Sequence, residues 1–510
     1  MTPSDQADKP SPGPIWKEPW VWAALAVALA LRAGALVWID PEPDGLARWY
    51  VRGATAMASG HGLLMRTPGA WQNPNEFSTQ IRETEYMKQR ARAGGRIDPE
   101  HPYPRRTDGW VPATLRPAGY STLLYLLYQA GNYDGMVLGA HLLQAGLDAF
   151  VCVLLFLLGR NVYNRRAGLA AAWIYALMPP AIVLTFRMLP DSLGRFFPAL
   201  ILCLASYARP GRGWVLVPAG MACGLAFYFR PGFLLFPAVL FLIAWVWRRR
   251  LLWSLGWAGA AVAGLLLVQL PWLLWTRAAT GTALFTTTSA GGSMYEALGE
   301  DPNNPWGVVL HDNWVDRDAI RRGFVSAWSV EADRFYRAEW RKCVGERPDF
   351  YARLVLFRRL PLAVLPPYIV RGKAKAGDFS FSKVRIEEGL GHSEAIRKYP
   401  LRVMKAFWRE MIMLGISAVL LTALVGVAAA RWRDWRRSAW FVLPWGYAIG
   451  TICLIKQVEP RNVSPALVPQ SLALALAILG IQAWWKRRRE RRPASVAGRL
   501  DADQTAKSMS

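Results

Sequence analysis

The sequence predicts an all-α, polytopic membrane protein with about ten transmembrane helices and two large segments outside the membrane. Hydrophobic residues make up 53% of the 510 residues and recur in runs that approach the length of a bilayer-spanning helix. Charged residues are 19% of the chain, so they must be concentrated between those runs. The net charge is +25, and the basic residues lie beside the runs, where such residues set topology and attract lipid headgroups. We therefore expect membrane lipids as partners, and no nucleic acid.

The first apolar run, Trp20 to Ile39, follows a polar tail and is expected to be an uncleaved anchor. Nine further runs complete the set: 136–158, 169–186, 192–207, 213–229, 231–247, 251–275, 410–430, 438–455 and 463–485. The expected order is a cytoplasmic tail (1–18), the first transmembrane helix (19–39), an extracytoplasmic loop (40–135), six transmembrane helices (136–275), a large extracytoplasmic segment (276–409), three transmembrane helices (410–485) and a basic cytoplasmic tail (486–510).

Charge alternation between the short loops sets the sidedness. Arginine clusters follow alternate runs, and the positive-inside rule places these clusters in the cytoplasm. By this count Pro117 to Gly131 is a juxtamembrane or re-entrant helix, since it would reach only about 22 Å against a hydrocarbon core of about 30 Å. Leu354 to Val370 is apolar but broken by arginines and prolines, so we expect it to lie at the membrane interface.

Three acidic residues, Asp40, Glu42 and Asp44, follow the first run directly. The residues after them place apolar side chains at helical spacing, which predicts an amphipathic helix on the membrane surface that contains Tyr50. One interpretation is that the acids cap this helix and complement its dipole. The other is that one of them is a general base that deprotonates an acceptor hydroxyl or amine.

From this point the sequence resembles the GT-C class of glycosyltransferases, in particular the polyprenyl-phosphate-sugar-dependent branch that contains the protein O-mannosyltransferases and the lipid A aminoarabinose transferases. The matching segments occur in order along residues 20–480: Tyr50, Ala54 and Gly60-His61-Gly62; Arg116-Pro117-Ala118-Gly119-Tyr120; Asp191; Phe229-Arg230-Pro231-Gly232; Pro271-Trp272, Gly281, Thr286-Thr287-Thr288, Gly291-Gly292 and Asn304-Pro305; and Glu459-Pro460-Arg461-Asn462. One position departs from the pattern, because Leu46 stands where the family acid is often found.

The resemblance implies a GT-C-like fold with juxtamembrane helices, and a transferase that moves a hexosyl or pentosyl group from a polyprenyl-phosphate sugar donor at the extracytoplasmic face. Asp44 is our first choice for the base, and Asp191 is the second catalytic candidate. We keep Asp40, Glu42, Tyr50 and Glu296 as acceptor-binding or secondary candidates. The acceptor is left open between lipid, glycan and protein. The implied location is a bacterial inner membrane.

Arginines are the candidate ligands for the donor phosphate. A polyprenyl-phosphate donor keeps its tail in lipid and its phosphate at the headgroup level, and Arg116, Arg230 and Arg461 lie at that level. Guanidinium suits phosphate because it forms bidentate hydrogen bonds. The alternative for each arginine is snorkelling of the charged head to the interface.

Other polar residues have ordinary explanations. Asp191 can cap the fourth span together with Ser192, or it can orient the acceptor. His141, Gln144 and Asp148 share one face of the second span, where hydrogen bonding between helices is the expected use. A divalent metal cofactor is left open, because no spacing of Cys, His or acidic residues indicates one.

Two other functions compete with the transferase. A flippase or transporter of lipid-linked saccharides would need a polar path through the spans, whereas the polar residues gather at the external ends. A catalytically silent membrane scaffold is the second alternative, because the acid is displaced from its usual position.

The topology makes a prediction about chemical labelling. Single cysteines placed at Asn75 and at Ser508 should react with a membrane-impermeant maleimide from opposite sides of the membrane, Asn75 from outside and Ser508 from the cytoplasm. Labelling of both positions from the same side in intact cells would contradict the expected topology.

Overall fold

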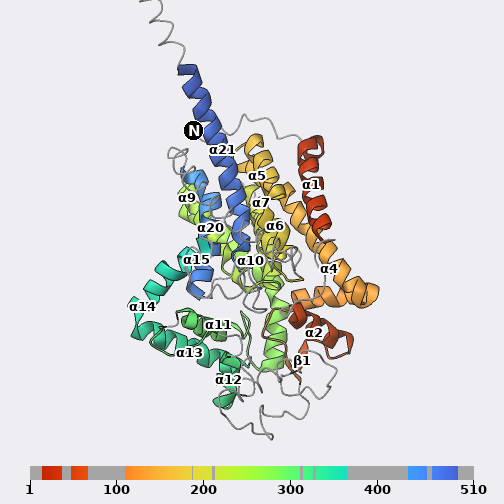
Figure 1. Cartoon of the computed structure of the whole chain (residues 1–510), viewed down its shortest axis with the longest axis vertical. Coiled ribbons are helices and arrows are strands. Elements are labelled where there is room, and N and C mark those ends of the chain that lie inside the picture. The colour runs from red at the N-terminus through yellow and green to blue at the C-terminus, as the bar shows by residue number, and fades with distance from the viewer. Residues whose placement is uncertain are drawn as a thin grey trace, which may run out of the picture.

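A computed structural model describes residues 14–36, 47–66, 110–185, 188–208, 213–301, 303–310, 314–324, 329–364, 435–455 and 462–491. Its apolar helices are α1 (Pro19–Leu36), α4 (Gly119–Val162), α5 (Arg165–Leu177), α6 (Pro179–Leu184), α7 (Leu193–Ser206), α8 (Leu216–Phe227), α9 (Phe236–Arg248), α10 (Leu251–Thr280), α20 (Trp435–Ile455) and α21 (Leu467–Arg491). The segments between them contain α2 (Ala47–Ala58), α11 (Ala290–Glu296), α12 (Trp314–Arg321), α13 (Val330–Glu346), α14 (Pro348–Arg353) and α15 (Leu360–Val364). Figure 1 shows most of the long helices in one half of the molecule, and α2, α11, α12 and α13 in the other half, into which α10 extends.

The helical membrane class predicted from the sequence is confirmed. In the described part of the chain, four helices are long and apolar enough to cross a membrane, namely Gly119–Val162, Leu251–Thr280, Arg436–Ile455 and Ser464–Lys486. Shorter apolar helices occur at Pro19–Gly34, Leu193–Ser206, Gly213–Phe227 and Pro231–Trp247. The count of about ten stays a prediction, because the expected span 410–430 lies outside the described residues.

Two local features differ from the expected pattern of helices. The expected span 169–186 is divided into α5 and α6, since Pro179 and Pro180 cannot donate the backbone hydrogen bonds that would continue α5. A two-stranded antiparallel ribbon lies within the loop 40–135: β1 (Leu64–Arg66) pairs with β2 (Trp110–Pro112).

Helix α4 contains a sharp bend that separates the expected juxtamembrane helix from the following span. Gly131 and Asn132 have non-helical backbone angles, and Asn132 has a positive φ of 57°. The Asn132 side chain accepts hydrogen bonds from the backbone N–H groups of Asp134 and Gly135 at 3.1 and 3.2 Å, and so caps the second half of the helix. Figure 1 shows the first half of α4 lying across the direction of the second half.

A buried ion cluster joins four apolar helices around Asp148 of α4. The carboxylate accepts hydrogen bonds from Arg32 Nε of α1 and from Arg195 Nε of α7, both at 2.6 Å, and from the Tyr175 hydroxyl of α5 at 2.7 Å. Arg32, Asp148 and Arg195 are fully buried. The hydrogen bonding between helices that was expected for this face of α4 is confirmed at Asp148.

The segment 276–409, which the sequence predicts to lie outside the membrane and which we call the second extramembrane segment, has a small core of its own. Its buried residues are Tyr295, Leu298, Val308, Val315, Ala319, Ala332, Tyr336 and Cys343. The Gly291 N–H donates to Asp333 Oδ1 at 2.6 Å, which ties the start of α11 to α13. Arg359 ties the segment to the bundle, since it donates to Glu300 Oε2 and to the carbonyl of Cys453 in α20, both at 3.0 Å.

The segment expected at the interface is described as far as residue 364. It begins as a π-helix, Leu354–Arg359. Leu356 and Phe357 are 53% and 75% exposed, so this turn presents apolar side chains outward. That surface agrees with the interfacial position expected from the sequence.

We predict that Asp148→Asn lowers the thermal stability of the purified protein strongly. The change leaves two buried guanidinium groups without a counter-charge, and removal of one partner from a buried ion pair costs about 3–5 kcal/mol. The matched control is Asp349→Asn, because Asp349 pairs with Arg347 and Arg353 at an exposed position and should matter little. Equal unfolding temperatures for the two variants in lipid nanodiscs would contradict this account of the bundle.

Candidate functional site

The predicted amphipathic helix after the first span is present as α2. Its buried positions include Ala47, Tyr50 and Ala54, so one face of the helix packs inward at helical spacing. A side chain at Gly53 would bring its Cβ within 2.6 Å of Ser121 Oγ in α4, so glycine permits a close approach of the two helices there. Helix α2 is therefore fixed against the first half of α4.

Arg116 and Tyr50, both predicted site residues, are in direct contact. Arg116 Nη1 donates a hydrogen bond to the Tyr50 hydroxyl at 3.1 Å, and its guanidinium lies 5.2 Å from the centroid of the Tyr50 ring. Tyr50 also packs edge-on against Tyr120, with ring centroids 5.1 Å apart. These contacts hold the guanidinium at one place on the surface of the bundle.

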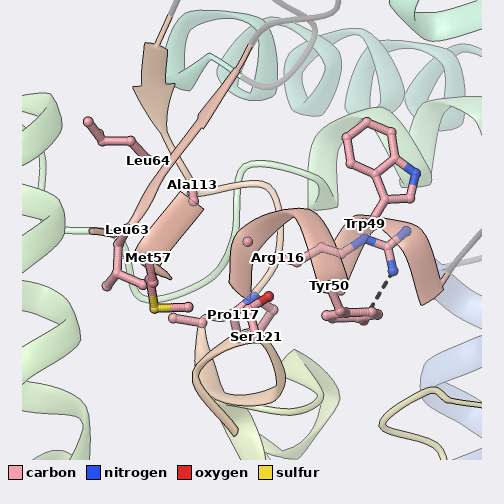
Figure 2. A pocket seen from close by; sticks show the side chains of 11 residues that line it. Trp49, Tyr50, Met57, Leu63, Leu64, Ala113, Arg116, Pro117 and Ser121 are labelled. Atoms are coloured by element: carbon pink, nitrogen blue, oxygen red, sulfur yellow. Dashed lines mark hydrogen bonds between the residues drawn. The ribbon is translucent and has the colours of Figure 1, made fainter. Parts of the chain in front are cut away.

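A pocket lies between α2, the start of α4 and the β-ribbon. Its lining residues are Trp49, Tyr50, Gly53, Met57, Leu63, Leu64, Ala113, Arg116, Pro117, Ala118 and Ser121. Figure 2 shows Met57, Leu63 and Leu64 at one end of this pocket, and Arg116 with Tyr50 and Trp49 at the other. A cation at one end of an apolar pocket suits an amphiphile with an anionic headgroup.

Asp191 and Arg230 form a partly buried ion pair. Arg230 Nη2 donates to Asp191 Oδ1, and their side chains are 16% and 4% exposed. The capping alternative for Asp191 is not observed: Ser192 occupies the N-cap of α7 without a side-chain capping bond. The Arg230 side chain lies against α7, since a Cβ added to Gly194 would be 2.8 Å from Arg230 Cδ.

The two arginine-bearing turns are hydrogen-bonded to each other. The Gly119 N–H, three residues after Arg116, donates to the Tyr228 carbonyl at 2.9 Å, two residues before Arg230. A Cβ on Gly119 would come within 2.6 Å of Tyr228, so the contact requires glycine. The structure therefore brings Arg116, Tyr50, Arg230 and Asp191 to one end of the bundle.

Asp40, Glu42, Asp44 and Arg461 lie outside the described residues. Asn462, which follows Arg461, accepts a hydrogen bond from Arg230 at 3.4 Å. Glu296 is the last residue of α11.

Sequence reasoning missed two contributors near this site. Trp49 lines the pocket beside Arg116. Thr114 holds the segment before Arg116 against the start of the second extramembrane segment, since the Thr288 N–H donates to its carbonyl at 3.0 Å. The run Thr286-Thr287-Thr288 was noted in the sequence, but no local pattern indicates that its partner is 174 residues away.

Two ionisable side chains of the second extramembrane segment, Tyr295 and Cys343, are unsuited to base chemistry. Burial raises the pKa of Tyr295 to about 12, and it raises the pKa of Cys343 to about 11. Both groups therefore stay protonated near neutral pH. In the described part of the chain, no group of three His, Cys, Asp or Glu side chains could hold a metal ion.

A protein-family model matches part of this chain. The family model described as dolichyl-phosphate-mannose-protein mannosyltransferase matches residues 135–275. The resemblance to polyprenyl-phosphate-sugar-dependent GT-C enzymes is thereby confirmed over the six expected spans that precede the second extramembrane segment. No curated relative matches this chain in sequence. The chain is an integral membrane protein.

Several solved structures are similar in shape at low sequence identity. The oligosaccharyltransferase of Archaeoglobus fulgidus, tethered with an acceptor peptide containing the NVT sequon, shares 11% identity over 94% of this chain and 51% of its own, with a TM-score of 0.46. The archaeal oligosaccharyltransferase AglB from the same organism, with an inhibitory peptide and a dolichol-phosphate, shares 14% identity over 94% and 52%, also at 0.46. ArnT from Cupriavidus metallidurans, bound to undecaprenyl phosphate, shares 14% identity over 91% and 77%, at 0.40. This chain spans about half the length of the oligosaccharyltransferase chains.

We predict that Arg116→Ala weakens binding of a polyprenyl phosphate by about 10- to 100-fold, because a hydrogen bond to a charged group contributes about 1.5–3 kcal/mol. Arg116→Lys should weaken it less, since the lysine keeps the charge and loses the bidentate geometry. The control is Arg52→Ala, because Arg52 stacks over Trp49 at 5.1 Å but does not line the pocket. The affinity of the wild type and of the three variants is measured by titration with the lipid phosphate, followed by tryptophan fluorescence. Unchanged affinity in both Arg116 variants would exclude the phosphate role.

Proposed function

We propose that this chain is a membrane glycosyltransferase that moves a sugar from a polyprenyl-phosphate-linked donor to an acceptor at the extracytoplasmic face. The observation that carries the proposal is the pocket beside Arg116, which combines an apolar end with a fixed guanidinium. The family match over residues 135–275 supports the same reaction class. We place the protein in a bacterial inner membrane.

The donor chemistry fits this arrangement. A polyprenyl chain stays in the lipid, while its phosphate and sugar lie at the headgroup level, where a surface helix such as α2 is expected. In the proposed step, a base removes a proton from the acceptor and the acceptor oxygen or nitrogen attacks the anomeric carbon. The bond from that carbon to the phosphate oxygen breaks, and polyprenyl phosphate leaves with the bonding electron pair. Arg116 and Arg230 would stabilise the negative charge on the leaving phosphate.

The roles of the acids follow from their surroundings. Asp191 is held by Arg230, which favours a role in orienting that guanidinium over a role as the proton acceptor. Asp44 is proposed as the base, with Asp40 and Glu42 as alternatives a few residues away. Arg461 is proposed as a third phosphate ligand because Asn462 reaches Arg230. Tyr50 is proposed to act through Arg116, and Glu296 remains a secondary acceptor candidate.

A transfer assay separates this function from the transporter and the scaffold. Purified protein in nanodiscs is incubated with radiolabelled polyprenyl-phosphate sugars and an acceptor extract. A transferase releases polyprenyl phosphate and labels the acceptor, whereas a flippase or a scaffold leaves the donor intact. No release with hexosyl or pentosyl donors would refute the proposal.

The base assignment predicts that Asp44→Asn cuts turnover by about two orders of magnitude or more and leaves donor affinity nearly intact. Asparagine keeps the size and much of the hydrogen bonding of aspartate but lacks its basicity. Asp40→Asn and Glu42→Gln are the matched controls on the same segment. Normal turnover in Asp44→Asn with collapse in a neighbour would move the base to that neighbour. Loss of donor affinity together with turnover would indicate a positioning role for Asp44.

A further inference from the structure

Two buried hydrogen bonds connect the Arg116 side of the site to the Asp191 side. The Tyr120 hydroxyl, in the first half of α4, donates to Gln144 Oε1 at 2.7 Å in the second half. Gln144 Nε2 donates to the Leu189 carbonyl at 3.1 Å. Leu189 lies two residues before Asp191, and Tyr120 packs against Tyr50, the partner of Arg116.

The amide of Gln144 is suited to this connection because it has an acceptor at one end and a donor at the other. Tyr120 needs an acceptor and the Leu189 carbonyl needs a donor, so one orientation of the amide satisfies both. All three residues are at most 1% exposed, and water cannot replace either bond without a cavity. Each bond therefore holds its two segments at a fixed separation.

The contacts form an unbroken series between the two cations. Arg116 bonds to Tyr50, Tyr50 packs on Tyr120, and Tyr120 bonds to Gln144. Gln144 holds the backbone that leads to Asp191, and Asp191 pairs with Arg230. The direct backbone contact between Gly119 and Tyr228 fixes the two turns, whereas the Arg230 side chain is held by its bonds to Asp191 and Asn462.

We infer that Gln144 is a positioning residue that sets the relative orientation of the Arg116 and Arg230 guanidinium groups. It acts through Tyr120 on one side and through the backbone from Leu189 to Asp191 on the other. The inference rests on the proposed function in that it gives both guanidinium groups one lipid phosphate as their ligand. It assigns a role to a glutamine inside the membrane bundle that does not itself touch the phosphate. Both ends of its amide are hydrogen-bonded, and these two bonds connect both halves of the site.

The test is a thermodynamic cycle on lipid-phosphate binding. Affinity for undecaprenyl phosphate is measured by tryptophan fluorescence for wild type, Gln144→Met, Arg116→Ala and the double variant. Gln144→Met should weaken binding by about tenfold, of the order of one lost hydrogen bond. In the Arg116→Ala background the same change should have little further effect, because misalignment matters only when both guanidinium groups bind the phosphate.

The matched control is Gln269→Met in α10. Gln269 is also fully buried, and its amide atoms have no hydrogen-bond partner among the described residues. The Gln269→Met substitution should therefore leave the affinity for undecaprenyl phosphate at the wild-type value. Tyr120→Phe is the milder variant should Gln144→Met fold poorly, since it removes a single hydroxyl and should weaken binding in the same direction.

Three results would overturn the inference. Wild-type affinity in both Gln144→Met and Tyr120→Phe would mean that the hydrogen bonds do not align the site. Equal losses from Gln144→Met with and without Arg116 would indicate a general structural effect. Absence of undecaprenyl phosphate binding by the wild type would remove the ligand on which the inference depends. Binding with the predicted cycle but without sugar release would refute the proposed function alone.

Discussion

The polar face of α4 is the constraint on which the rest of the structure depends. Lipid offers no hydrogen-bond partners, so a buried charge such as Asp148 depends on other parts of the chain for its hydrogen bonds and counter-charge. The Asp148 carboxylate accepts hydrogen bonds from Arg32 of α1, Arg195 of α7 and Tyr175 of α5, which joins these three helices to α4. Gln144, one turn earlier on the same face, extends the polar contacts toward the membrane surface.

The same packing places the charged residues of the candidate site at the surface end of the bundle. The bend at Gly131 and Asn132 returns the first half of α4 toward the bundle, and a Cβ on Gly139 would touch Leu127 at 3.1 Å. Because of the bend, Tyr120 reaches Gln144 and Arg116 reaches Tyr50, and each pair forms a hydrogen bond. The cation that the proposal assigns to the phosphate is thus held by residues that come from the first extramembrane loop, while Arg230 comes from the turn after α8.

The sequence was informative where a local pattern decides the structure. Apolar spacing predicted α2, and the limited length of Pro117 to Gly131 predicted a helix distinct from the next span. The pairing of Asp191 with Arg230 could not be predicted, because 39 residues separate them and helix packing alone brings them together. The same holds for Asp148 and Arg32, which are 116 residues apart. Capping of α7 by Asp191 and Ser192 was the local alternative, and the ion pair replaced it.

The central claim is that a polyprenyl phosphate binds at the end of the pocket marked by Arg116. Photo-crosslinking tests it most directly, with undecaprenyl phosphate that carries a diazirine in the isoprene unit next to the phosphate. After irradiation in nanodiscs and proteolysis, the account predicts adducts on residues 47–64 and 113–121, reduced in Arg116→Ala and competed by unlabelled undecaprenyl phosphate. Adducts confined to other surfaces, or adducts at the pocket that unlabelled lipid does not displace, would contradict it.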